Sequence, residues 1–139
     1  MRILTKDMQI RAFIDAAFAL HWDAKSHTGV IITIGGGVVF VSSKKQKCMT
    51  ASRTESELGG LTDNLGLVGL FYEFVCFLPG RRIGIPIVYQ DSTSVISLIT
   101  RGGGIMRTKH LRARMFIAKG LFESEDVLVC YLNTKENSC

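Results

Sequence analysis

The sequence is poor in the features that mark secreted and membrane proteins. The N-terminal stretch "MRILTKDMQIR" lacks the long apolar core of a signal peptide. The most apolar later run, Leu65 to Leu78, is too short to cross a bilayer and contains Glu73. We therefore expect an intracellular protein, cytoplasmic or nuclear, with no membrane partner.

Metal-binding and disulfide motifs are also absent. The four cysteines, Cys48, Cys76, Cys130 and Cys139, form no CxxC pair and have no close histidine. This spacing argues against a zinc site and against a disulfide framework. Reduced thiols are the expectation.

The composition indicates one folded domain with a basic surface. Of the 139 residues, 47% are hydrophobic and 21% are charged, and no linker or repeat divides them, so we expect a single domain over 1–139. The net charge is +5, and the bases gather around residues 44–53 and 101–114. Such clusters mark either a polyanion-binding surface or an ordinary solvated face.

The apolar pattern predicts a mixed α/β chain. Strands are expected over 12–19, 30–34 and 38–41, with a turn at 35–37 and a short strand over 47–52. The later pattern predicts a strand over 85–90, helices over 92–100 and 109–123, and a strand over 126–132. An antiparallel meander followed by alternating helices and strands implies a mixed sheet with helices packed on it.

A long helix is predicted from Thr54 onward. Apolar residues recur three and four positions apart, which gives one helical stripe: Leu58, Leu61, Leu65, Val68, Tyr72 and Val75. Thr54 and Glu57 have the spacing of a capping box, which gives Glu57 a structural role at the helix start.

Three carboxylates occupy positions that can converge. Asp15 interrupts the apolar run "AFIDAAFAL", Glu57 begins the long helix, and Asp91 ends a buried strand. If the first and fourth strands are neighbours, these carboxylates meet at one end of the sheet, where a divalent cation would offset their repulsion. Oxygen ligands suit Mg²⁺ or Mn²⁺, and two such ions about 4 Å apart support phosphodiester hydrolysis. Taken singly, Asp15 could cap a turn and Asp91 could cap the next helix.

Several stretches occur together in an order typical of one family: "FIDAAFALHWDAKSHTGVIITIGGG", "SSKKQK", "SRTESEL", "VYQDSTSVISL", "RTKH" and "LNTKEN". In these stretches the chain resembles the ribonuclease H domain of Ty1/copia-type retrotransposon polyproteins. The resemblance implies a ribonuclease H-like α/β fold, in which a five-stranded mixed sheet, antiparallel in its first three strands and parallel in the last two, is flanked by helices.

The same resemblance implies a function and its residues. It implies cleavage of the RNA strand of RNA–DNA hybrids with two Mg²⁺ (or Mn²⁺) ions. We also expect a monomer, with the rest of a reverse transcriptase polyprotein as a partner. By position, Asp15, Glu57 and Asp91 are then the catalytic acids and the metal ligands. Glu57 is preferred over Glu55 because it directly precedes the "L.GL" pattern of the helix.

The chain departs from the family pattern at several points. The family's fourth acid follows a "TKEN.A" segment, whereas here Thr134–Asn137 is followed by Ser138 and Cys139, so the final helix and tail are expected to be missing. The "SSTEAE" stretch reads Ser-Arg-Thr-Glu-Ser-Glu over 52–57. We expect activity impaired by the loss of the fourth acid; the alternative is a non-catalytic nucleic-acid-binding remnant of the same fold.

Nine residues are the candidates for nucleic-acid contact: Lys44, Lys45, Lys47, Ser52, Arg53, Thr54, Arg107, Lys109 and His110. The first three lysines could bind phosphates, which gives affinity that depends on salt and not on sequence. The three residues at 52–54 could reach the minor groove, where the 2′-hydroxyl distinguishes RNA from DNA. The last three match "RTKH" and either touch nucleic acid or support the fold.

Overall fold

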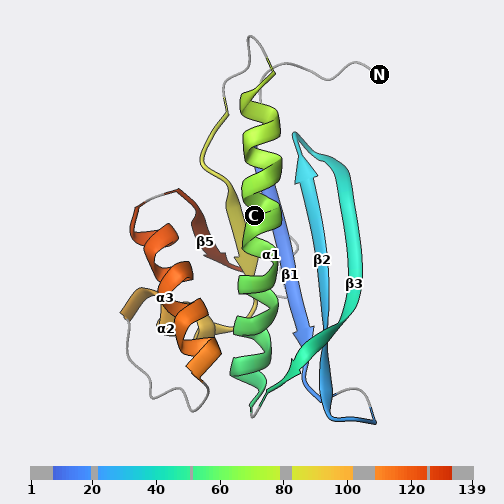
Figure 1. Ribbon diagram of the computed structural model, residues 1–139. Coiled ribbons are helices and arrows are strands. Elements are labelled where there is room, and N and C mark those ends of the chain that lie inside the picture. The colour runs from blue at the N-terminus through green and yellow to red at the C-terminus, as the bar shows by residue number, and fades with distance from the viewer. Residues whose placement is uncertain are drawn as a thin grey trace.

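Five strands form one sheet in the computed structural model, which describes residues 8–19, 22–50, 52–78, 83–101, 109–124 and 126–132. The elements are β1 (Ile10–Ala17), β2 (Lys25–Ile34), β3 (Gly37–Met49), α1 (Arg53–Cys76), β4 (Ile87–Gln90), α2 (Thr93–Arg101), α3 (Lys109–Glu123) and β5 (Leu128–Tyr131). The strand order is β3-β2-β1-β4-β5 (Figure 1). The pairs among β1–β3 are antiparallel, whereas β4 runs parallel to both β1 and β5. The predicted mixed sheet is confirmed.

The β2–β3 hairpin is longer than its apolar residues indicate. The strand expected over 30–34 begins earlier than predicted, because β2 starts at Lys25. The two strands expected over 38–41 and 47–52 are one continuous strand up to Met49. Both extensions consist of polar residues paired across the hairpin, such as His27 opposite Lys45, so hydrophobicity gives no signal there. Gly35 and Gly36 adopt positive φ angles of 57° and 87°, which glycine tolerates in a two-residue turn.

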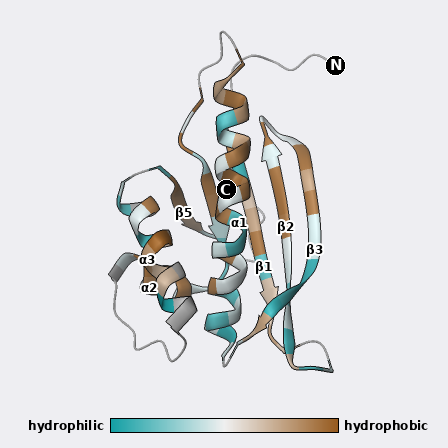
Figure 2. Cartoon of the chain, viewed as in Figure 1, coloured by the Kyte–Doolittle hydropathy of each residue, from teal (hydrophilic) through white to brown (hydrophobic). Residues whose placement is uncertain are grey.

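The core lies between the sheet and α1, which lies in front of the sheet in Figure 1. Alternate residues of β1 are buried, and α1 buries Leu58, Leu61, Leu65, Val68 and Val75, which confirms the predicted stripe. Helix α3 adds Met115 and Ala118, whereas Ile117 is 66% exposed. Figure 2 shows the hydrophobic residues of the strands beneath α1. No helix in the described ranges is long and apolar enough to span a membrane.

The starts of α1 and α2 differ from the prediction in a way that matters for the acids. The N-cap of α1 is Ser52, whose Oγ accepts a hydrogen bond from the Glu55 backbone N–H at 3.2 Å. The predicted Thr54–Glu57 capping box is therefore wrong. Ser92, and not Asp91, caps α2 by accepting from the Val95 N–H at 3.4 Å. The structural roles considered for Glu57 and Asp91 are thus filled by two serines.

Three predictions fall on parts of the chain outside this description. Arg107 lies outside the described residues, as does the segment from Thr134 to Cys139 where the missing acid was inferred. Lys109 and His110 open α3, but their side chains are not described. These stay predictions.

Candidate active site

Asp15 lies on β1, and Asp91 directly follows the neighbouring parallel strand β4. The pairing of β1 with β4 sets Arg11 opposite Ile87 and Phe13 opposite Tyr89. Two residues further along each strand, this register brings Asp15 beside Asp91. Both acids line one cavity of about 350 Å³. The side chain of Asp15 is exposed and that of Asp91 is half-buried.

The environment of Asp91 disfavours its negative charge. Burial raises the pKa of Asp91, and the negative charges of Asp15 and then Glu57 raise it further. Its Oδ1 is buried and has no hydrogen-bond partner. A buried carboxylate oxygen without a donor is costly, so this atom is suited to a proton or a cation. The three predicted acids therefore lie within electrostatic range of one another.

Glu57 is held by an arginine of its own helix. It lies in the first turns of α1, is only 3% exposed, and accepts a hydrogen bond from Arg53 Nε at 2.9 Å. This ion pair raises the pKa of Arg53, to which the negative charges of Asp91 and Asp15 add smaller contributions. Arg53 is thus the cation nearest to the acids among the described contacts, a role that its sequence position did not indicate.

The acids have the oxygen ligands that a divalent cation prefers, but they are not grouped closely enough to hold one. Carboxylate oxygens are the ligands that Mg²⁺ and Mn²⁺ prefer, and the partnerless Asp91 Oδ1 in the shared cavity can accept an ion. Within the described ranges, however, no three His, Cys, Asp or Glu side chains are grouped closely enough to hold a metal. The Glu57 carboxylate is paired with Arg53 instead.

A buried glutamine fixes the start of α1 against the sheet. Gln46 Nε2 donates to Thr28 Oγ1 and to the Ser56 carbonyl, both at 2.8 Å. The helix comes so close here that a Cβ on Gly60 would lie 2.9 Å from the Thr28 side chain. These contacts locate Glu57, which follows Ser56. Sequence reasoning missed Gln46, and its only signal was an amide between lysines in "KKQK".

The three lysines of "KKQK" are exposed near the end of β3, which Figure 2 colours as hydrophilic. Lys44, Lys45 and Lys47 line a shallow cavity of about 360 Å³. Lys45 Nζ lies 2.6 Å from Asp23 Oδ2 and 5.8 Å from the ring centre of Trp22. The lysine side chain lowers the pKa of Asp23. The other two lysines offer their charges to solvent, as a phosphate-binding surface requires.

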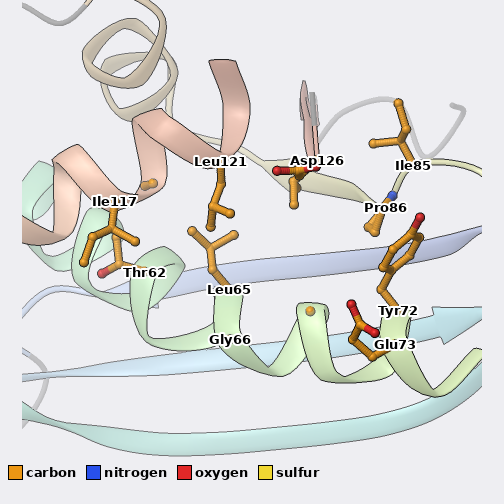
Figure 3. A pocket seen from close by; sticks show the side chains of 13 residues that line it. Thr62, Leu65, Gly66, Tyr72, Glu73, Ile85, Pro86, Ile117, Leu121 and Asp126 are labelled. Atoms are coloured by element: carbon orange, nitrogen blue, oxygen red, sulfur yellow. The ribbon is translucent and has the colours of Figure 1, made fainter. Parts of the chain in front are cut away.

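A larger cavity lies away from this chemistry. It measures about 680 Å³ and lies between α1, α3 and the segment before β4, with Leu65 and Leu121 facing each other across it (Figure 3). Its lining is mainly apolar and includes none of the three acids. The candidate active site is therefore the smaller cavity at the ends of β1 and β4.

The fold belongs to the ribonuclease H class. The structure superposes on ribonuclease H1 from the archaeon Halobacterium salinarum with a TM-score of 0.62 and 17% identity, covering 91% of this chain and 87% of that one. It also matches LC11-RNase H1, from a compost metagenome and solved in complex with an RNA/DNA hybrid, with a TM-score of 0.63 and 16% identity, over 94% and 89% of the two chains. At these identities the likeness concerns the fold.

Sequence similarity points to a more specific relative than the fold does. The chain is 32% identical over 132 residues to the retrovirus-related Pol polyprotein from transposon TNT 1-94 of Nicotiana tabacum. The match covers 94% of this chain and 10% of the polyprotein, so the chain spans about a tenth of that relative. No protein-family model matches. By sequence the chain is similar to a segment of a retrotransposon Pol polyprotein, and by structure it has the ribonuclease H fold.

Proposed function

We propose that this domain binds RNA–DNA hybrids and cleaves their RNA strand in the presence of Mg²⁺ or Mn²⁺. The observation that supports this most strongly is the register of β1 with β4, which brings Asp15 beside Asp91 at one cavity. The negative charge of Glu57 raises the pKa of Asp91, which supports Glu57 as the third acid of the same site.

Each acid has a defined part in this proposal. Asp15 and Asp91 would hold the cation from the sheet, since the Asp91 Oδ1 lacks another partner. Glu57 would complete the ligand set from α1, to which the Gln46 contacts anchor it. These residues would hold divalent ions, which would supply an activated water and stabilise the leaving oxygen of the phosphodiester.

The substrate surface lies on β3 and the start of α1. Lys44 and Lys47 are exposed and would bind backbone phosphates. Ser52 and Thr54 flank the acid cluster at the helix start, where a hydroxyl could contact the 2′-oxygen of the RNA strand. The similarity to a Pol polyprotein supports a reverse transcriptase polyprotein as the natural context.

A second candidate is a hybrid-binding domain without turnover. It is favoured by one observation: Glu57 is already paired with Arg53, and the described residues form no ready three-ligand group. Both candidates share the basic surface, so binding alone does not separate them.

Cleavage of a labelled RNA–DNA hybrid tests the proposal. The purified chain is incubated with the hybrid in Mg²⁺, in Mn²⁺ and in EDTA, beside Asp15→Asn and a double-stranded DNA of the same sequence. We expect metal-dependent cleavage of the RNA strand that disappears in Asp15→Asn. Hybrid binding with no cleavage in either metal would support the second candidate, and the absence of both would reject the two together.

A further inference from the structure

The acid cluster of this chain already contains a cation of its own. Arg53 Nε donates to Glu57 Oε1 at 2.9 Å across one turn of α1. The Glu57 side chain is 3% exposed, whereas that of Arg53 is 73% exposed. The buried carboxylate is thus neutralised by a side chain that comes from the solvent side.

The charge of Arg53 reaches beyond its direct partner. The carboxylates of Asp91 and Asp15 both raise the pKa of Arg53, and Arg53 in turn lowers that of Asp91. Three further ion pairs, of Lys25 and Lys45 with Asp23 and of Lys119 with Glu123, involve none of these acids. Arg53 is therefore bonded to one of the three acids and interacts electrostatically with the other two.

We propose that Arg53 is an internal counter-cation that competes with the divalent ion for Glu57, so that metal binds fully only when the Arg53–Glu57 contact opens. This inference rests on the proposed function, because it takes the three acids as the metal ligands. In the family motif that the chain resembles, the position of Arg53 carries an uncharged serine. The arginine would then lower metal affinity while leaving the fold intact.

The exposure of the two side chains favours such a competition. Glu57 is buried, and a buried carboxylate without a partner is costly, so in the metal-free protein the ion pair is the better state. The guanidinium lies mostly in solvent and can leave at little cost in desolvation. A metal ion would have to displace it or bind with Asp15 and Asp91 alone, and either route weakens binding.

Mn²⁺ binding to the full chain tests this without any assay of activity. Free Mn²⁺ is measured by its electron paramagnetic resonance signal during titration of the parent chain, Arg53→Ser, and Arg53→Gln as a second neutral variant. Lys119→Ser is the matched control, because it removes one positive charge from another i,i+4 pair. Circular dichroism checks that each variant is folded.

We expect Arg53→Ser and Arg53→Gln to bind Mn²⁺ more tightly than the parent, on the order of tenfold, because a unit charge beside the ligands opposes a second cation. Adding Asp15→Asn to either variant should remove the gain, and Lys119→Ser should bind as the parent does. Unchanged or weaker binding in a folded neutral variant would overturn the inference, as would an equal gain in Lys119→Ser.

Failure of this inference differs from failure of the proposed function. If the parent cleaves the hybrid and Arg53→Ser binds Mn²⁺ no more tightly, the inference is wrong and the function stands. If Arg53→Ser gains affinity through Asp15 while no variant binds the hybrid, the inference stands and the function is wrong.

Discussion

Phe13 and Tyr89 stack across β1 and β4 with ring centroids 4.8 Å apart and planes 9° apart. Phe13 lies two residues before Asp15 on the same face of β1, and Tyr89 lies two residues before Asp91, which directly follows β4. The stack thus helps to fix the register that aligns the two carboxylates. The parallel pairing of β1 with β4 brings Asp15 and Asp91 to one candidate site, to which α1 adds Glu57.

The stability of the protein should depend on pH through Asp91. Folding raises its pKa above the usual value of 3.8, so its favourable contribution is fully present below 3.8 and is lost as pH rises through the raised value. Asp91→Asn mimics the protonated form. We expect this variant to be more stable than the parent at pH 7 and equally stable below 3.8.

Urea unfolding at several pH values measures this difference. Glu123→Gln, a variant of an exposed carboxylate on α3, is the control. An advantage of Asp91→Asn that is the same at every pH would contradict the assigned environment of Asp91.

Gln46 should matter for both stability and the site. Gln46→Leu removes two hydrogen bonds and leaves Thr28 Oγ1 and the Ser56 carbonyl without this donor. We expect a loss of about 2 kcal/mol in the free energy of unfolding, measured in urea. Cys48→Ser, an exposed change on the same strand, should be nearly neutral. A neutral Gln46→Leu would show that the glutamine does not anchor α1.

Two glycines of α1 should respond to alanine in opposite directions. A Cβ on Gly66 meets nothing within 4 Å, so Gly66→Ala should stabilise the helix by about 1 kcal/mol. A Cβ on Gly60 lies 2.9 Å from two Thr28 atoms, so Gly60→Ala should destabilise the fold by about 1–3 kcal/mol. Thermal unfolding of the two variants checks both signs, and equal shifts would contradict the close packing at Gly60.

The β3 lysines should set the salt dependence of hybrid binding. If Lys44 and Lys47 each neutralise one phosphate, the double alanine variant should lower the slope of log affinity against log salt by about 2. Trp22, the single tryptophan, is 95% exposed beside Lys45, so its fluorescence offers a direct signal for binding. Lys119→Ala on α3 is the control, and an unchanged slope in the double variant would place the phosphates elsewhere.

The order of the helices and strands and the buried face of α1 could be predicted from the sequence. The helical spacing of the apolar residues from Leu58 to Val75 predicted that they share one face. A dense apolar run predicted β4. The polar parts of β2 and β3 were not predicted, because the residues that pair there give no hydrophobic signal. The capping prediction failed because Ser52 and Thr54 both precede a glutamate by three residues, and only the backbone shows that the helix starts from Ser52.

The acids of the candidate site could be predicted from the sequence, but the side-chain contacts around them could not. Asp15 and Asp91 were identified from their strand positions and from a family resemblance. The Arg53–Glu57 pair and the Gln46 anchor depend on side-chain directions that one sequence does not encode locally. The first contact involves the acid Glu57 itself, and the second involves Ser56, the residue before it.

The most direct measurement is a map of Mn²⁺ binding by nuclear magnetic resonance on the ¹⁵N-labelled chain, with Arg53→Ser alongside the parent. Paramagnetic broadening should centre on Asp15 and Asp91 and extend to the amide of Glu57, more strongly in Arg53→Ser. Broadening centred on Asp126 and Glu73 at the apolar cavity, or none at the ends of β1 and β4 in either protein, would contradict the account.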